Sequence, residues 1–328
     1  MTQAPLVTVV LPVYNGAKHI AFAVESILAQ SFKDFELLVV DDGSTDATHD
    51  VLYSFADERL RLIRHKTNLG LIPSLNEGIA EAQGALIARQ DADDVSLPDR
   101  LTKQVAFLED HPEVGLLGTF YAKIDSTGEI LVKQSLPTTD AAIRQRMTTA
   151  NCFCHGSVLV RKECLEKTGP YRDMAGPTED YDLWLRLLEV TRGANLPEVL
   201  YHWCVSLAGI LSRSDPEQAE ASRAFIRRVA ALRRKTGKDP LDIGNPEISA
   251  EYERVKKMRD ASPPPTHNRA RAILSLHIAE DLWRNGIAGR ALRWTGRAIW
   301  ADPLWPAPWR LGLGICCRSL LPKKNPEP

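Results

Sequence analysis

Two aspartates separated by one residue are the feature of this sequence that most directly suggests chemistry. The run Asp91-Ala92-Asp93 is a D-x-D pattern that follows a short apolar stretch. Mg²⁺ and Mn²⁺ prefer oxygen ligands, and they often bind one or two carboxylates together with substrate phosphates. Such an ion would allow a diphosphate to leave with its charge neutralised. The pattern alone is weak evidence, because aspartates in loops are more often solvated or cap a helix.

The surrounding sequence predicts the scaffold that these carboxylates need. Strands that alternate with helices favour a parallel, doubly wound α/β sheet with helices on both faces. Ligands of such sheets bind beyond the carboxyl ends of the strands, where Pro12–Asn15, Asp41–Asp42 and Asp91–Asp94 all fall. The predicted strands are Leu6–Leu11, Phe35–Val40, Arg59–Arg64 and Ala85–Arg89; the predicted helices are Ala17–Gln30, Asp46–Ser54 with Asp46 as its cap, Ile72–Gln83 with Gly84 as its C-cap, and Pro98–Asp110.

The pattern is less regular beyond residue 111. It predicts strands at Val114–Lys123, Ser157–Val160 and Asn195–Tyr201, helices at Thr178–Val190 and 216–236, a proline-rich linker near 260–267, and two or three further helices. We therefore expect a catalytic domain over residues 1–212 and a helical C-terminal extension over residues 213–328.

The net charge of −1 hides an asymmetry between the two halves of the chain. Residues 1–200 hold 19 Lys+Arg and 29 Asp+Glu, whereas residues 201–328 hold 22 and 13. The basic half would suit an anionic membrane surface, or the two halves simply attract one another. The sequence contains no apolar run of about 18 residues and no signal-peptide pattern. We therefore expect a cytoplasmic protein, peripheral at most on the inner face of the plasma membrane, with no nucleic-acid partner.

The six cysteines do not form a usual zinc pattern. Cys152, Cys154, His155 and Cys164 lack the spacing of a structural zinc site, and we expect these thiols to be free and buried.

Several ordered motifs resemble those of the family 2 glycosyltransferases, which have the GT-A nucleotide-sugar fold. The resemblance covers roughly residues 5–205, and its motifs are Val7-x-Val9-x-x-Pro12-x-Tyr14-Asn15; Ser26-x-x-x-Gln30-x-Phe32 with Glu36; Val39–Asp46; Asn68-x-Gly70 and Asn76-x-Gly78; Asp91–Asp94 with Pro98, Arg100, Leu101 and Gln104; His155-Gly156-Ser157; and Thr178–Arg186. Any one of these motifs could arise by chance, but their order makes the set specific.

The resemblance implies a nucleotide-diphosphate sugar donor. Asp42 would accept a hydrogen bond from a nucleobase N–H, Asp91 would face the nucleoside or the donor sugar, and Asp93 would bind Mn²⁺ or Mg²⁺. Pyrimidine edges fit an aspartate acceptor, which favours a UDP- or dTDP-sugar. The residues implied to hold the donor are Pro12, Tyr14, Asn15, Asp42, Asn68, Arg89, Asp91 and Ala92.

The resemblance also implies an acceptor side. Asp180 would be the catalytic base of an inverting displacement, taking the acceptor proton while the diphosphate leaves from the opposite face. His155, Glu179 and Trp184 are further acceptor-side candidates, and Trp184 would either stack on an acceptor sugar or pack in the core. The expected acceptor is a glycan or lipid-linked glycan in the synthesis of lipopolysaccharide, capsule or exopolysaccharide.

One stretch departs from the pattern of relatives, and another imitates a motif of a different group of enzymes. Many relatives carry a Tyr-Arg-x-x-x-His-like stretch near the diphosphate, whereas this chain reads Tyr201-His202-Trp203-Cys204-Val205-Ser206. His202 or His155 could replace the missing histidine, or neither. The run Arg290-x-x-Arg293-Trp294 imitates a motif of processive synthases, but it lies far from Asp180 and has no membrane-spanning helices beside it. We therefore expect the transfer of a single sugar.

Other functions stay open. A nucleotidyltransferase would usually show a glycine-rich, basic loop near the N-terminus, which Pro12–Gly16 lacks, and a degenerate nucleotide- or glycan-binding module would not need both Asp93 and Asp180. Residues 268–321 hold five of the seven tryptophans. This segment could form a helical hairpin like a tetratricopeptide repeat, lie in a membrane interface or pack on the catalytic domain.

Overall fold

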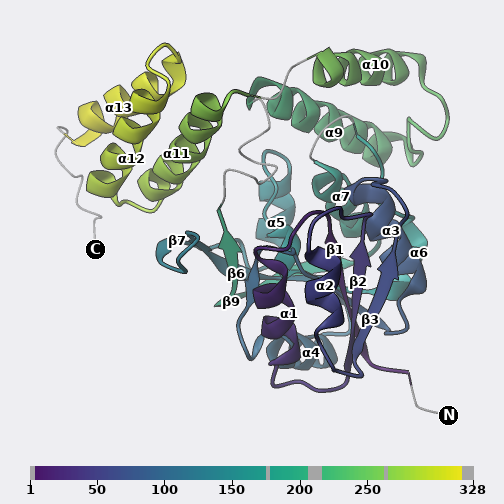
Figure 1. Cartoon of the computed structure of the whole chain (residues 1–328). Coiled ribbons are helices and arrows are strands. Elements are labelled where there is room, and N and C mark those ends of the chain that lie inside the picture. Colours follow the sequence, from purple (N-terminus) through teal and green to yellow (C-terminus); the bar gives the residue numbers. More distant parts are fainter. Residues whose placement is uncertain (1–3, 175–177, 206–215, 262–264, 320–328) are drawn as a thin grey trace, which may run out of the picture.

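The computed structural model describes residues 4–174, 178–205, 216–261 and 265–319 (Figure 1). Nine strands within these ranges form one mixed sheet in the order β3-β2-β1-β4-β8-β6-β9-β5, with β7 paired to β6. The first four pair in parallel, β8 is antiparallel to both its neighbours, and β6 and β9 are parallel. The strands are β1 Val7–Val13, β2 Phe35–Asp41, β3 Leu60–Arg64, β4 Leu86–Arg89, β5 Val95–Ser96, β6 Val114–Ile124, β7 Ile130–Gln134, β8 Leu159–Arg161 and β9 Arg192–Cys204.

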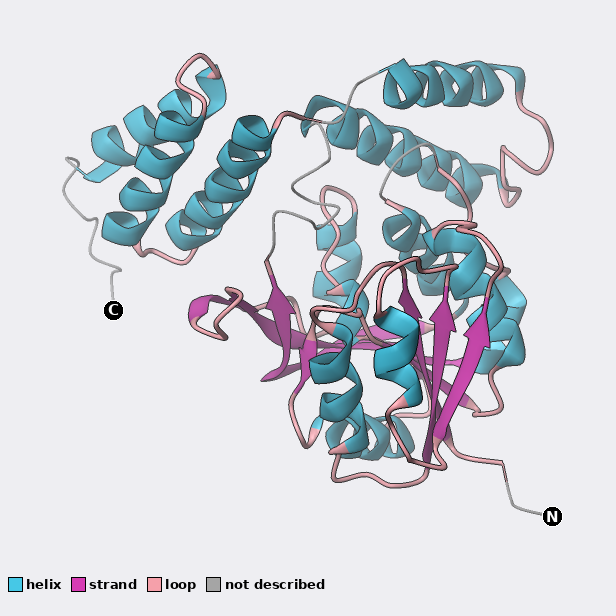
Figure 2. Cartoon of the chain, viewed as in Figure 1, coloured by secondary structure: helices cyan, strands magenta, loops and turns pink. Residues whose placement is uncertain are grey.

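Helices cover both faces of the sheet (Figure 2). Because side chains alternate along a strand, Val9 and Leu11 of β1 face the cluster under α1, α2 and α4, while Val10 faces the cluster under α3, α5, α6, α7, α9 and α10. The helices are α1 Ile20–Leu28, α2 Thr48–Tyr53, α3 Leu71–Glu81, α4 Arg100–Asp110, α5 Asp140–Met147, α6 Lys162–Thr168, α7 Glu179–Val190, α9 Pro216–Thr236, α10 Pro246–Ala261, α11 His267–Arg284, α12 Ala288–Ala301 and α13 Pro306–Ser319.

The last three helices pack on the edge of the sheet that carries β7. Leu131 and Val132 of β7 share a buried cluster with Ile278 and Leu282 of α11. Lys123 of β6 forms an ion pair with Asp281 of α11 at 2.5 Å. No helix in the described ranges is both long and apolar enough to cross a membrane.

Ion pairs also join the acidic half of the chain to the basic half. Arg233 of α9 pairs with Glu189 of α7 at 2.8 Å, and Arg259 of α10 pairs with Asp173 at 2.9 Å. The charge asymmetry is therefore used in part within the molecule itself.

The α/β fold with its mostly parallel first half is confirmed, as are the four strands and four helices predicted before residue 111, with shifted ends. Two of the predicted helix-capping residues were wrong. The helix α3 ends at Glu81 rather than near Gly84, which lies where a Cβ would meet the backbone of Thr8. Ala47 rather than Asp46 occupies the N-cap of α2, although Asp46 still accepts a hydrogen bond from Thr48 N at 3.0 Å.

The boundary predicted at residue 212 lies outside the described residues, and so does part of the predicted linker, residues 262–264. The division into two domains stays a prediction. The thiols of Cys152, Cys154 and Cys164 are buried as expected.

Candidate active site

The D-x-D loop begins directly after β4 and is fixed by its last aspartate. Asp94 is buried, and its two carboxylate oxygens accept hydrogen bonds from Tyr201 Oη at 2.7 Å and from Cys204 N at 2.8 Å. Both partners belong to β9, so the loop is anchored across the sheet. Asp91 and Asp93 remain partly exposed. Asp94 thus braces the loop, and the carboxylates of Asp91 and Asp93 remain accessible to a ligand.

Arg89 supplies a buried positive charge at the base of this loop. Its Nη2 donates to Asp91 Oδ1 at 2.7 Å, and its Nη1 donates to the Gln90 carbonyl. Its Nε has no hydrogen-bond partner among the described residues. Burial lowers the pKa of Arg89, and the nearby Asp91 carboxylate more than offsets that effect, so the guanidinium stays charged. The Arg89–Asp91 pair therefore carries no net charge.

Asp93 differs from Asp91 because no described side chain pairs with it. Burial, together with the negative charge of Asp91, raises the pKa of Asp93 to about 6. A desolvated carboxylate without a counter-charge fits a divalent cation that brings its own charge. The described residues hold no group of three or more histidine, cysteine or acidic side chains that could bind a metal ion by themselves. The oxygen donors here therefore suit an ion whose remaining ligands are substrate phosphates and water.

The start of α7 brings a second pair of acids to the same region. Asp180 Oδ2 accepts from Asn151 Nδ2 at 2.7 Å, and its Oδ1 accepts from Tyr181 N at 2.7 Å. Burial raises the pKa of Asp180 to about 6. Burial and the charge of Asp180 raise the pKa of Glu179 to about 8. The hydrogen bonds from Asn151 and from Tyr181 N favour the ionised form of Asp180, which suits this residue to accept a proton.

Asp182, the third acid of this turn, has a structural environment. Its carboxylate is buried and forms ion pairs with Arg172 at 2.7 Å and Arg186 at 3.0 Å. It lies two residues after Asp180 in a helix and so points well away from it.

His155 joins the two acidic pairs. Its Nε2 lies 2.9 Å from Tyr171 Oη, and its Nδ1 lies 4.0 Å from Glu179 Oε1. Burial, and then the positive charge of Arg89, lower the pKa of His155 to about 3, so the ring is neutral. Gly156 follows, and a Cβ there would collide with the hydroxyl of Tyr201 and lie 2.9 Å from Asp91 Oδ2. The region of His155 is therefore packed directly against the D-x-D loop.

Trp184 does not offer a stacking face to an acceptor. Its side chain is 0% exposed, and its ring packs 5.9 Å from the ring of His155 and 6.3 Å from that of Tyr171. The expectation of an exposed sugar platform is wrong, since the helix turns this residue into the core; core packing, the other alternative, is what the structure shows.

His202 lies on β9 beside Val95. Successive strand residues face opposite sides, and Tyr201 points at the D-x-D loop, so His202 faces the other way. Ser206 lies outside the described residues.

The loops at the carboxyl ends of β1 and β2 are tied together. Asn15, at φ 52°, accepts at Oδ1 from Thr45 N at 2.8 Å. Asp42 is buried and accepts at Oδ1 from Leu69 N and at Oδ2 from Gly70 N, both at 2.8 Å. The donor-side candidates Pro12, Tyr14, Asn15, Asp42 and Asn68 therefore lie on connected loops, with Pro12 buried and Tyr14, Asn15 and Asn68 exposed.

His65 is a member of this site that sequence reasoning missed. Its Nδ1 lies 2.6 Å from Asp42 Oδ1 and its Nε2 lies 2.5 Å from Glu77 Oε2. Burial lowers the pKa of His65, but the hydrogen bonds to both carboxylates more than offset it and raise the pKa above its ordinary value. Asn151, Tyr171 and Tyr201 were also missed; of these, only Tyr201 had a signal, its place at the end of a predicted strand.

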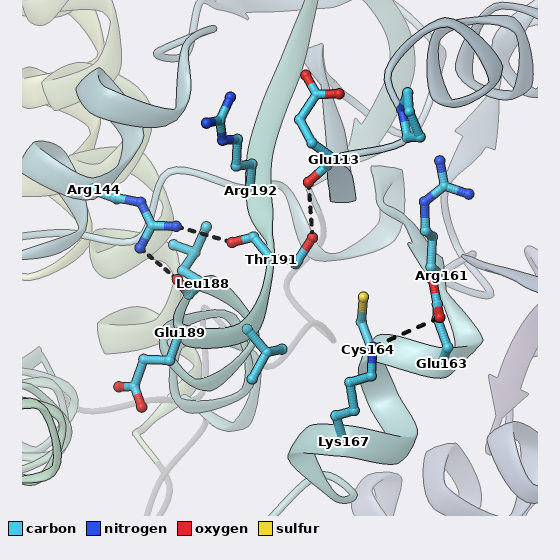
Figure 3. Close-up of a pocket in the computed structure, with 12 residues that line it drawn as sticks. Glu113, Arg144, Arg161, Glu163, Cys164, Lys167, Leu188, Glu189, Thr191 and Arg192 are labelled. Atoms are coloured by element: carbon cyan, nitrogen blue, oxygen red, sulfur yellow. Dashed lines mark hydrogen bonds and ion pairs between the residues drawn. The ribbon is translucent and has the colours of Figure 1, made fainter. Parts of the chain in front are cut away.

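A pocket of about 550 Å³ lies at the opposite edge of the sheet, near the starts of β6 and β9 (Figure 3). Two of its three arginines are already bound to backbone carbonyls: Arg144 donates to Leu188 O at 2.5 Å, and Arg161 donates to Val114 O at 2.9 Å. Arg161, which lines this pocket, pairs with Leu86 at the start of β4, whereas the D-x-D loop follows the end of β4. This pocket is therefore not part of the acidic site.

Comparisons with known proteins identify the family of the chain. A model described as "Glycosyl transferase family 2" matches residues 8–169. EpsE of Bacillus subtilis, named as a glycosyltransferase, is 40% identical over 208 residues, covering 61% of this chain and 73% of its own length. The amylovoran biosynthesis glycosyltransferase AmsE of Erwinia amylovora is 33% identical over 198 residues, covering 59% of this chain and 74% of its own.

Two solved structures share the fold at low sequence identity. Staphylococcus aureus TarS in complex with UDP-GlcNAc has a TM-score of 0.56 and 17% identity, covering 91% of this chain and 92% of that one. The mannosyltransferase PcManGT from Pyrobaculum calidifontis, in complex with GDP-Man and Mn²⁺, has a TM-score of 0.53 and 21% identity, covering 97% and 81%. With its D-x-D loop, its paired acids on α7 and its relatives, the chain belongs to the family 2 glycosyltransferases.

Proposed function

We propose that the protein is an inverting, metal-dependent glycosyltransferase that moves one sugar from a nucleotide-diphosphate sugar to an acceptor hydroxyl in the synthesis of a cell-surface glycan. The observation that carries this proposal is that two pairs of acidic residues lie in one region. Asp91 and Asp93 form one pair, Glu179 and Asp180 form the other, and Arg89, His155 and Tyr171 lie between them. One pair contains the unpaired Asp93, and the other contains the ionised Asp180. Each pair suits one half of the reaction, the donor half and the acceptor half.

On the donor side, Asp93 would hold Mn²⁺ or Mg²⁺, which supplies charge neutralisation to the diphosphate as it leaves. Asp91 is held in place by Arg89, so its carboxylate is oriented for hydroxyls of the nucleoside or sugar. We favour UDP- or dTDP-sugars. The carboxylate of Asp42 already accepts from Leu69 N and Gly70 N and lies against His65, so Asp42 would support the loops around the nucleobase. The donors named with the two solved neighbours contain uridine in one and guanosine in the other.

On the acceptor side, Asp180 would take the proton of the acceptor hydroxyl. The oxygen of that hydroxyl forms a bond to the anomeric carbon while the bond from that carbon to the diphosphate oxygen breaks, and the electron pair leaves with the diphosphate. Asn151 donates to Asp180 and holds its carboxylate in one orientation. A carboxylate with a pKa of about 6 is a stronger base than an ordinary aspartate and is still ionised at neutral pH.

The names of the relatives support a role in surface glycans. AmsE is named for amylovoran biosynthesis, and WbnJ of Escherichia coli, 30% identical over 205 residues, is named for O-antigen biosynthesis. We propose a glycan or lipid-linked glycan as the acceptor, and the inner face of the plasma membrane as the place of work.

A two-stage experiment tests the proposal. Thermal shift with nucleoside diphosphates, with and without Mn²⁺, should show stabilisation that needs both components, strongest for UDP or dTDP. Hydrolysis or transfer is then measured with sugars of the stabilising nucleotide, comparing the wild type with Asp180→Asn and with Asp50→Asn, an exposed aspartate on α2. Stabilisation without metal, or an Asp180→Asn variant as active as Asp50→Asn, would contradict the assignment.

A further inference from the structure

Four large apolar side chains are exposed around the turn between α12 and α13. Their exposed fractions are 76% for Trp300, 92% for Leu304, 49% for Trp309 and 65% for Leu313. We call these four residues the tip surface. Figure 1 shows this turn at the end of the three-helix group that lies away from the sheet. Side chains of this size are seldom left in water together unless they meet a partner.

Contacts hold the members of the tip surface close to one another. Trp309 Nε1 donates to the carbonyl of Pro303 at 2.9 Å, which places Trp309 next to Leu304. Leu313 lies four residues after Trp309 on α13 and shares its face. The guanidinium of Arg271, on α11, lies 5.6 Å from the centre of the Trp300 ring. The surface therefore lies where the end of α12, the turn after it and α13 meet, with Arg271 of α11 beside it.

The packing underneath keeps this patch in place. Ala291 and Ala298 of α12 are fully buried, and small residues there let α11 and α12 approach closely. Leu282 and Ile315 fill the space between the helices and belong to the cluster that includes β7. The exposed apolar residues thus belong to a packed group of helices, and the core between these helices is filled by other side chains.

The group of helices α11–α13 that carries the tip surface is strongly positive. Residues 267–316 contain seven arginines and only three acidic residues. Arg269 pairs with Asp302, and Arg284 pairs with Glu280 and Asp281. The remaining five form no ion pair with any residue that the structure describes: Arg271, Arg290, Arg293, Arg297 and Arg310.

The basic helix α9 differs in this respect. Arg223 and Arg227 pair with Glu220, and Arg228 pairs with Glu247 and Glu251. Its apolar face, which includes Phe225, is buried in the core. Within the basic half of the chain, α9 is therefore a weaker candidate for a membrane surface, because its charges and its apolar face are largely used within the molecule.

We propose that the tip surface inserts into the interface of an anionic lipid bilayer, with the unpaired arginines of α11–α13 binding the lipid phosphates. Tryptophan places an apolar ring and a polar N–H at the boundary between acyl chains and headgroups, and arginine binds phosphate with a planar fork. A second copy of the chain is a poorer occupant, because two such positive surfaces repel each other. This proposal rests on the proposed function in one respect: a lipid-linked acceptor would lie in the membrane to which the tip surface binds.

Vesicle flotation of the full chain tests this surface. The wild type should bind vesicles of phosphatidylglycerol and phosphatidylcholine, bind pure phosphatidylcholine weakly, and be released by high salt. The double variant Leu304→Ser/Trp309→Ser should bind the anionic vesicles at least about ten-fold more weakly, since each side chain loses its burial in the bilayer. Arg293→Gln/Arg297→Gln should weaken binding to anionic vesicles and leave the weak binding to neutral ones unchanged.

Matched controls separate this surface from general stickiness. Phe22→Ser on α1 and Tyr53→Ser on α2 remove side chains that are just as exposed elsewhere, and both should bind like the wild type. An unchanged melting temperature shows that a variant is folded. Metal-dependent hydrolysis of nucleotide sugar should stay at the wild-type rate, so that loss of membrane binding is distinguishable from failure of the catalytic assignment.

Three outcomes would overturn the proposal. The wild type does not bind anionic vesicles; or Leu304→Ser/Trp309→Ser binds as tightly as the wild type; or light scattering shows a dimer of the wild type that the same double variant abolishes, which assigns the tip surface to a second copy.

Discussion

Two groups of carboxylates at the same edge of the sheet are treated in opposite ways. Asp41 and Asp42, at the end of β2, lie beside donors or basic side chains. Asp41 accepts at Oδ1 from Ser44 N at 3.0 Å and its Oδ2 lies 3.5 Å from Arg64 Nε, while Asp42 binds two backbone amides and His65. Asp93 and Glu179 are desolvated without a pairing cation, and the pKa of each is raised. The protein places positive charge or N–H donors beside the first group, whereas the second group has no cation beside it and leaves a deficit of positive charge.

This difference indicates where a ligand must bring charge with it. Satisfied carboxylates hold loops in shape, and their free energy is already part of the folded state. Carboxylates without a nearby cation lower the stability of the fold. A metal ion or a proton from the acceptor can offset this loss, which is a reason for the fold to keep such carboxylates at a binding site. The comparison gives four predictions, which follow from the largest expected effect to the smallest.

Replacement of Asp93 by alanine should abolish transfer and remove the Mn²⁺-dependent stabilisation by nucleoside diphosphate. The reason is that Asp93 is the carboxylate of the D-x-D loop with no partner in the protein. The melting temperature without ligand should not fall, since no described side chain loses a bond. Thermal shift and a transfer assay measure both effects, with the exposed Asp50→Ala as the control. Activity that persists in Asp93→Ala, with or without a chelator, would remove the metal role.

Asp180→Asn should retain binding of donor and metal and lose about 10²–10⁴-fold in kcat, the usual contribution of a general base. In the wild type, kcat should fall about ten-fold per pH unit below pH 6, because the carboxylate becomes protonated there. Steady-state kinetics across pH 5–8 provide the measurement. If Glu179→Gln is inactive while Asp180→Asn is near normal, the base is Glu179.

Asp42→Asn should lower the free energy of unfolding by about 2 kcal/mol, because an amide NH₂ group then faces an N–H donor. Asp93→Asn should not lower it at all, which is the sharpest contrast between the two groups. Chemical denaturation of both variants at pH 7 measures the difference. Equal losses would mean that the two groups do not differ in how well the protein satisfies them.

Glu179→Gln should raise the melting temperature at pH 8 by about 3 °C. The folded pKa of Glu179 is about 8 against an ordinary value of 4.5, so the folded state holds the proton more tightly. The free energy of unfolding therefore falls as pH rises from 4.5 through 8, and a neutral glutamine avoids this loss. At pH 5 the variant and the wild type should melt alike. A difference that does not grow with pH would contradict the raised pKa.

The sequence predicted the elements whose signals are local. Buried strands such as Phe35–Asp41 are continuous apolar runs, and the D-x-D loop follows one of them. The strands β5 and β7 and the helices α5, α6 and α10 were not predicted, because they are short or weakly patterned and depend on distant partners. The burial of the Trp184 side chain depends on which face of α7 packs against the core, and periodicity alone does not give that direction.

The site was predictable to the same extent. Residues in motifs, such as Asp91, Asp93 and Asp180, could be named from the sequence. Their supports could not: Asn151 lies 29 residues before Asp180, and His65 lies 23 residues after Asp42, with nothing in the sequence to join them. Shifts in pKa depend on burial, so the raised pKa values of Glu179 and Asp180 emerged only with the fold.

The close packing of Gly156 has a consequence for how this enzyme can change over generations. Since any side chain at position 156 would collide with the Tyr201 hydroxyl, and that hydroxyl also binds Asp94 and the backbone of Asp91, the two positions cannot vary independently. A larger residue at 156 requires a smaller one at 201, and the D-x-D loop then loses its brace. In a library that randomises both codons, surviving clones should show covariation, with Gly156 and Tyr201 retained together or exchanged together.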